Sequence, residues 1–116
     1  MIYPVRITAA ARRDLEEIHT WISEHDSPES ANYVLDRLSN AAQSIATFPH
    51  RGIRPKELPA GMEEEYRQVF FKPYRVIYEI MNDHALIHVI ADGRRNLQSF
   101  LLRRLTDARI DSGFLG

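Results

Sequence analysis

The segment from Tyr66 to Phe100 constrains the fold of this chain most strongly, because it contains three runs with the composition of β-strands. The runs are residues 66–71, 74–81 and 85–91. Asn82-Asp83 gives a turn signal between the second and third runs, and Lys72-Pro73 separates the first from the second. The segment therefore predicts three adjacent strands with tight connections. We expect the residues before it to supply helices that cover the sheet.

The residues before this segment predict one short strand and a helical hairpin. Residues 2–7 alternate in the manner of a strand, and the proline among them predicts an edge or early position for that strand. Thr8 is a suitable N-cap for a helix that runs to about Glu24. Ser27-Pro28 begins a second helix, which Pro49 ends. The link between the helices is so short that they must lie antiparallel.

The element order β-α-α-β-β-β-α predicts a single α+β domain, with the helices on one face of a mainly antiparallel sheet. Strand alternation assigns one set of side chains to the core face: Tyr74, Val76, Tyr78 and Ile80. The third run is apolar on both sides, so we expect a central strand, with residues 85, 87, 89 and 91 on one side. A last helix from Asn96 to about Ala108 completes a domain of residues 1–109, and residues 110–116 are expected to form a tail.

The composition excludes several kinds of site. The 116 residues include no cysteine, so there is no disulfide, thiolate metal site or cysteine nucleophile. No HExxH, GxSxG or glycine-rich phosphate loop is present, and we expect no metal, no cofactor and no catalytic residues. The N-terminus is too polar for a signal peptide, and no apolar run approaches the roughly 20 residues of a membrane span. These features predict a cytoplasmic protein.

Arginine is the residue type left to carry function. The net charge is −1, but residues 67–109 hold eight basic and four acidic side chains, which favours an anionic partner for that half. Strand parity is expected to bring Arg67 and Arg75 to the same sheet face, near Arg94 and Arg95 at the end of the neighbouring strand. Their guanidinium groups would suit phosphate or carboxylate. The alternative is that acidic residues of the chain itself neutralise them: Glu79, Asp92 and residues 63–65.

Four motifs follow one another along the chain. They are AARRDLEEIHTWI at residues 10–22, Phe48-Pro49 with Gly52 and RPKEL at 54–58, YRVIY at 74–78, and GRRN at 93–96. Together they resemble the ParE branch of the RelE/ParE toxin superfamily, the toxic halves of bacterial type II toxin–antitoxin modules. The resemblance spans Val5 to about Leu102. It implies a helical hairpin on a mainly antiparallel sheet, growth inhibition, and control by a cognate ParD-like antitoxin.

The resemblance also implies a choice between two mechanisms. Members of the RelE branch cleave mRNA on the ribosome with basic strand residues and a C-terminal aromatic residue. Arg67, Arg75 and Arg95 match basic positions of that pattern, but Val69 replaces a second base and Leu101 replaces the tyrosine. The chain therefore resembles the ParE-branch inhibitors of DNA gyrase more closely. Ribosome-dependent mRNA cleavage is the alternative, and a non-toxic member that only binds its antitoxin is a third reading.

The residues predicted to contact the antitoxin or the target are Arg67, Arg75, Arg94, Arg95 and Trp21. We expect an acidic antitoxin segment that folds on binding and places apolar anchors in the grooves beside the helices. Its acidic groups are expected to meet Arg75 and either Arg94 or Arg95. We expect no membrane partner and no sequence-specific DNA binding by this chain alone.

Overall fold

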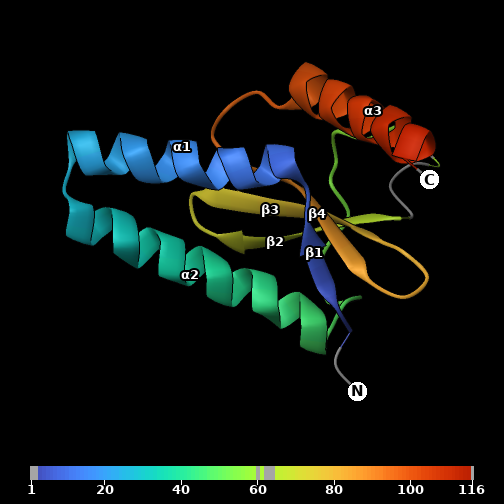
Figure 1. The fold of residues 1–116 in the computed structure, drawn as a ribbon, viewed down its shortest axis with the longest axis horizontal. Helices are drawn as coiled ribbons and strands as arrows, with labels where there is room; N and C mark the ends of the chain where they lie inside the picture. Colours follow the sequence, from blue (N-terminus) through green and yellow to red (C-terminus); the bar gives the residue numbers. More distant parts are fainter. Residues whose placement is uncertain (1–2, 60, 62–64, 116) are drawn as a thin grey trace.

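A four-stranded sheet lies between a helical hairpin and a third helix in this computed structural model (Figure 1). The structure describes residues 3–59, 61 and 65–115, with side chains of the last helix described to Asp107. The elements are β1 (Val5–Ile7), α1 (Ala9–His25), α2 (Pro28–Thr47), β2 (Tyr66–Phe71), β3 (Tyr74–Ile80), β4 (Ala85–Asp92) and α3 (Gln98–Leu115). The predicted order and α+β class are confirmed.

The helical hairpin begins each of its helices at the predicted residue. The Thr8 hydroxyl accepts the Ala11 N–H at 3.0 Å, and the Ser27 hydroxyl accepts the Ser30 N–H at 3.0 Å. Each cap satisfies one of the amide groups that a helix leaves unpaired at its start. Pro28 occupies the first turn of α2, where its missing N–H costs nothing. These local signals explain why the hairpin could be read from sequence.

The sheet has the strand order β1-β4-β3-β2. β1 pairs with β4 in parallel, while β2–β3 and β3–β4 are antiparallel. The Met81 N–H bonds to the His84 carbonyl at 2.8 Å and closes the predicted turn at 82–83. The expected central position of β4 and edge position of β1 are both confirmed.

Helices cover both faces of the sheet, whereas the sequence had predicted them on one. Val76 and Tyr78 belong to the cluster under the hairpin, which confirms their predicted face. Ile77 and Val89 point the other way and pack with three leucines of the α3 region: Leu97, Leu101 and Leu105. Because β3 and β4 are apolar on both sides, each side needs a cover that removes it from water.

A β-bulge in β4 overturns the predicted alternation of that strand. Ile77 pairs with Val89 while Tyr78 pairs with Ile87, so His88 is an extra residue on β4. Ile87 and Ile90 therefore face the hairpin, and Val89 faces α3. Simple period-two counting across residues 85–91 was wrong because one inserted residue reverses the parity of everything after it.

An ion pair between α1 and α3 holds the bulge. β1 is too short to pair with β4 beyond Ile87, which leaves part of that edge uncovered. The Asp14 carboxylate accepts the Ile90 N–H at 3.0 Å and two Arg104 N–H groups at 2.8 and 3.0 Å. Arg104 also donates to the His88 carbonyl at 3.0 Å. The two side chains thereby satisfy the backbone of the open edge and fix both helices to it.

The last helix is longer than predicted. It continues to Leu115, past the expected end near Ala108, so residues 110–115 are helical. The segment contains no proline, and a single Gly113 weakens a helix by only about 1 kcal/mol relative to alanine without ending it. Among the described residues, no helix has the length and apolar character that a bilayer crossing requires.

Replacing Asp14 should test how much this ion pair contributes to the fold. We expect Asp14→Ala to lower the free energy of unfolding by about 2–3 kcal/mol, because it removes the acceptor of the Ile90 amide and the carboxylate partner of Arg104. Urea unfolding followed by circular dichroism measures the change. Glu16→Ala, at an exposed site on the same helix, is the control and should change stability by less than about 0.5 kcal/mol. Equal stabilities of the two variants would contradict this role.

Candidate functional site

A cleft on the α3 side of the sheet brings together two of the arginines that the sequence analysis had singled out, Arg75 and Arg95. It has a volume of about 560 Å³ and lies between the loop that precedes β2, the faces of β2 and β3, and the start of α3. We call it the α3-face cleft. Its basic lining residues are Arg54, Lys56, Arg75 and Arg95, and Glu57 is the one acidic residue among the described lining residues. The cleft is therefore strongly cationic.

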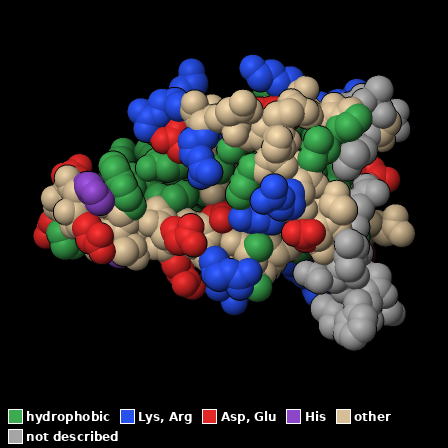
Figure 2. All heavy atoms as spheres, turned by 90° about the horizontal axis from the view of Figure 1, so that it is seen from above, with side chains coloured by type: hydrophobic (Ala, Val, Ile, Leu, Met, Phe, Trp, Pro, Cys, Tyr) green, Lys and Arg blue, Asp and Glu red, His purple; other side chains and the backbone are tan. Residues whose placement is uncertain are grey.

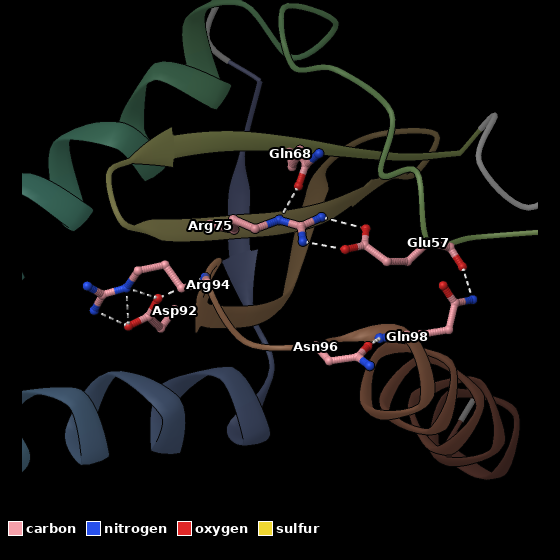
Figure 3. A network of polar contacts seen from close by, with 7 residues as sticks. All are labelled: Glu57, Gln68, Arg75, Asp92, Arg94, Asn96 and Gln98. Carbon is pink, nitrogen blue, oxygen red and sulfur yellow. Dashed lines mark hydrogen bonds and ion pairs between the residues drawn. The ribbon is translucent and has the colours of Figure 1, made fainter.

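Arg75 forms the buried floor of this cleft. Figure 3 shows its guanidinium group pointing from β3 toward Glu57, with Gln68 of β2 beside it. The two terminal nitrogens donate to the Glu57 carboxylate at 2.5 and 2.7 Å, and Nε donates to Gln68 Oε1 at 2.6 Å. The side chains of Arg75 and Glu57 are only 9% and 10% exposed. An internal carboxylate thus holds the position at which the sequence analysis placed an acidic group of the antitoxin, and the contact between Arg75 and a partner stays a prediction.

The protein holds Glu57 in position from several sides. Its pKa is lowered, chiefly by the hydrogen bonds from Arg75, so the carboxylate stays ionised despite burial that acts in the opposite direction. The Gln98 side chain donates to the Glu57 carbonyl at 2.7 Å and ties the loop to α3. Gly93 lets the arginine stem pass, because a Cβ there would lie 2.8 Å from Arg75 Cδ. The pair is thus a fixed part of the fold.

Arg67 lies on the opposite face of the sheet from Arg75. The β2–β3 register pairs Arg67 with Tyr78 and Phe70 with Arg75, so the predicted shared face is wrong. Parity within each strand does not show which residues pair across the hairpin. The register sets Arg67 opposite Tyr78, which lies three positions from Arg75 and therefore on the other face. Arg67 donates to the Gly52 carbonyl at 3.0 Å and braces the loop against the hairpin side.

Arg94 and Arg95 are adjacent but have different surroundings. Arg94 donates to Asp92 at 2.6 Å and lies apart from the Arg75 group in Figure 3. This ion pair confirms the predicted alternative for Asp92, whereas Glu79 contacts His88 at 2.9 Å instead of an arginine. Residues 63 and 64 lie outside the described residues. Arg95 is exposed, and its guanidinium lies 5.5 Å from the centre of the Phe100 ring; among the described residues it makes no direct ion pair.

Trp21 lines a second concave surface, between α1 and the start of α3. We call it the α1–α3 groove; it has a volume of about 420 Å³ and is lined by Ile18, Trp21, Tyr74, Ile90, Arg95 and Phe100 among others. Trp21 is 60% exposed and stacks on His25 at a ring distance of 4.2 Å. Figure 2 shows hydrophobic side chains gathered toward the end of the molecule where the hairpin helices join, bordered by acidic and basic groups. An exposed aromatic in such a groove is typical of an interaction surface.

Sequence reasoning missed the acidic half of the cleft. Glu57 was noted only as part of the RPKEL motif, and Gln68 was not singled out. An acid in a loop with two prolines, followed by a strand arginine, gives no spacing from which a contact over 18 residues could be inferred. The described residues contain no group of three or more His, Cys, Asp or Glu side chains arranged to hold a metal ion.

Comparisons with known proteins place these features in a family. Residues 5–97 match the family described as ParE toxin of type II toxin-antitoxin system, parDE. The chain is 27% identical over 88 residues to Toxin ParE3 of Caulobacter vibrioides, covering 76% of this chain and 84% of that protein. It is 31% identical over 86 residues to the putative toxin Y4kP of Sinorhizobium fredii, covering 74% and 84%. The predicted family resemblance is thereby confirmed.

Solved structures show the same fold. The chromosomal ParDE toxin–antitoxin system from P. aeruginosa matches with a TM-score of 0.67 at 18% identity, over 78% of this chain and 96% of that chain. The toxin–antitoxin complex RelBE2 from Mycobacterium tuberculosis matches with a TM-score of 0.59 at 21% identity, over 79% and 99%. These likenesses confirm the predicted arrangement of a helical hairpin on a mainly antiparallel sheet.

The Glu57–Arg75 pair predicts a pH dependence of stability. Because the folded pKa of Glu57 is lowered, its contribution is complete above the ordinary value of 4.5 and is lost as pH falls through the folded pKa. We expect Glu57→Gln to lower the free energy of unfolding by about 2–3 kcal/mol at pH 7, because Gln cannot offer Arg75 a charged fork. The gap between the two proteins should close in acid, where Glu57 itself becomes neutral.

Urea unfolding of both proteins between pH 3 and pH 7 measures this gap. Glu24→Gln is the matched control, because Glu24 is exposed on α1 and has no ion-pair partner among the described residues. The control should stay within about 0.5 kcal/mol of the parent protein at pH 7. A Glu57→Gln gap that stays constant across the whole range would show that the charge of Glu57 does not stabilise the fold.

Proposed function

Since the chain belongs to the ParE toxin family of type II toxin–antitoxin systems, we propose that it inhibits bacterial growth by acting on DNA gyrase and that a cognate ParD-like antitoxin neutralises it. The proposal treats the protein as a docking molecule without catalytic residues of its own, acting in the cytoplasm where DNA gyrase works. The observation that carries it is the set of hydrogen bonds that Arg75 makes within the chain. That buried guanidinium is already bound on three nitrogens by Glu57 and Gln68.

The positions that would distinguish a ribonuclease also support docking. Leu101, at the position that resembles the C-terminal tyrosine of the RelE branch, is fully buried between α3 and the sheet. Val69, at the position of a second strand base, packs toward the helical hairpin on the other face. Neither position presents a group to the α3-face cleft that could move a proton. The exposed cation that remains beside both concave surfaces is Arg95.

The α1–α3 groove is the surface that we assign to the antitoxin. Its Trp21 and Phe100 rings offer anchors for an apolar side chain, and Arg95 lies beside them to meet a carboxylate. The groove lining has three acidic residues, Asp14, Glu17 and Asp92, and two basic ones, Arg94 and Arg95, so its charges are close to balanced. The affinity of the antitoxin for this groove would come mainly from burial of aromatic surface, and the charged groups would orient the antitoxin. This assignment moves the expected acidic contact from Arg75 to Arg95.

Purified gyrase provides the direct test of the target. We expect the protein to reduce supercoiling of relaxed plasmid and to increase the yield of cleaved DNA at stoichiometric concentrations. Arg95→Glu should raise the half-inhibitory concentration at least tenfold, because it reverses the charge of the exposed side chain that lines both the α3-face cleft and the α1–α3 groove. Arg12→Glu makes the same charge change at an exposed position of α1 and should act like the parent protein. Unchanged supercoiling at a large excess of protein would reject gyrase as the target.

Ribosome-dependent mRNA cleavage is the second candidate, and the cationic lining of the α3-face cleft favours it. Arg54, Lys56 and Arg95 are exposed there and could follow an RNA backbone. Primer extension on translated mRNA after induction separates the two functions. Codon-specific cuts would support the ribonuclease, whereas intact messages together with cleaved chromosomal DNA would support the gyrase proposal.

Truncation of Trp21 tests the antitoxin surface. We expect Trp21→Ala to weaken binding of the antitoxin encoded beside this chain by roughly thirtyfold, about 2 kcal/mol, because an aromatic anchor is lost. Isothermal titration calorimetry measures the change. Tyr33→Ala is the matched control, since Tyr33 is an aromatic residue of similar exposure, 56%, that lies on α2 away from the groove. Equal losses in both variants would place the antitoxin elsewhere.

A further inference from the structure

The Glu57 carboxylate occupies the position in which the α3-face cleft would hold an external anion. It contacts Arg75 through two parallel hydrogen bonds of 2.5 and 2.7 Å, an arrangement that a guanidinium makes equally well with carboxylate or phosphate oxygens. The Nε–H of Arg75 donates to Gln68 at 2.6 Å, which leaves the two terminal nitrogens of the guanidinium to face Glu57. The arginine is therefore preorganised for one oxyanion, and the chain supplies that oxyanion itself.

The surroundings of this pair favour an anion with more than one negative charge. Arg54, Lys56 and Arg95 line the same cleft, and among the described residues none of them makes a direct ion pair. The cleft is also bordered by residues 96–98, which lead into α3, and the amino end of a helix adds positive potential. One carboxylate cannot balance four cations. The charge of the lining thus exceeds what Glu57 neutralises.

Glu57 is held in the cleft by the burial of its neighbours. Pro55 is fully buried and Leu58 is 8% exposed, so both flanks of the short segment are anchored. Gln98 adds the hydrogen bond of 2.7 Å to the Glu57 carbonyl. An intramolecular carboxylate fixed in this way acts at a high effective concentration and outcompetes a free anion of modest affinity.

We propose that the α3-face cleft is a phosphate-binding site that the chain keeps occupied with its own Glu57. In the parent protein, phosphate groups are limited to the exposed cations at the mouth of the cleft. Without the Glu57 carboxylate, a phosphate group binds the Arg75 fork and is flanked by Arg54, Lys56 and Arg95. This inference concerns the isolated chain and goes beyond the proposed action on gyrase.

Pyrophosphate binding to single variants tests the proposal. We expect Glu57→Ala to bind pyrophosphate at least tenfold more tightly than the parent protein in calorimetric titrations at low salt. Glu24→Ala removes the same charge from an exposed position of α1 and should leave the affinity unchanged. In the Glu57→Ala background, Arg75→Lys keeps the positive charge but loses the fork, so most of the gain should disappear. A gain no larger than that of Glu24→Ala overturns the proposal.

Two further measurements make the result independent of folding and identify the source of the phosphate. Circular dichroism establishes that each variant is folded, and if Glu57→Ala does not fold, Glu57→Gln carries the same comparison with the same criterion. A labelled single-stranded RNA, titrated by fluorescence anisotropy, shows whether backbone phosphates share the gain or whether it is limited to free pyrophosphate. No gyrase or antitoxin is present, so failure here leaves the proposed function untouched, and the converse also holds.

Discussion

Burial of both faces of β4 is the constraint on which the rest of this structure depends. The strand is central, and its inserted residue His88 sends Ile90 to the hairpin side and Val89 to the α3 side. Two apolar faces need two covers, so the chain must return across the sheet after β4 to place α3 opposite the hairpin. The α1–α3 groove and the α3-face cleft both lie where this return leaves the sheet incompletely covered.

The arginines of this region show how burial decides what a charge can do. Arg75 is buried, and a buried guanidinium is tolerated only with a partner of opposite charge, which Glu57 provides. Arg94 is exposed and meets Asp92 two residues before it, an interaction of small energetic value in water. Arg95 is exposed, lies over the Phe100 ring and makes no direct ion pair with the part of the chain that the structure describes. Arg75 is therefore part of the fold, Arg94 forms a local ion pair, and Arg95 keeps a charge that a partner could meet.

The elements that sequence could predict are those whose signals are local. The caps at Thr8 and Ser27, the turn at 82–83 and the alternation of β3 depend on neighbours within a few residues, and the structure has them as expected. The errors arose where a long-range choice intervened. The bulge at His88 is stabilised by Asp14, 74 residues earlier in sequence, and by Arg104. The face of Arg67 depended on a register that parity alone does not set.

The same dependence on distant contacts explains why a fold of this kind can host different activities. Phosphate and carboxylate are alternative ligands of one guanidinium, so a loop that brings an acid onto Arg75 changes what the cleft can hold without altering the sheet beneath it. The loop itself is fixed by Pro55, Leu58 and the Gln98 contact, which are features of packing. A fold alone therefore does not determine the activity of such a cleft. The residue opposite the buried arginine decides which group its guanidinium binds, and in this chain that residue is Glu57.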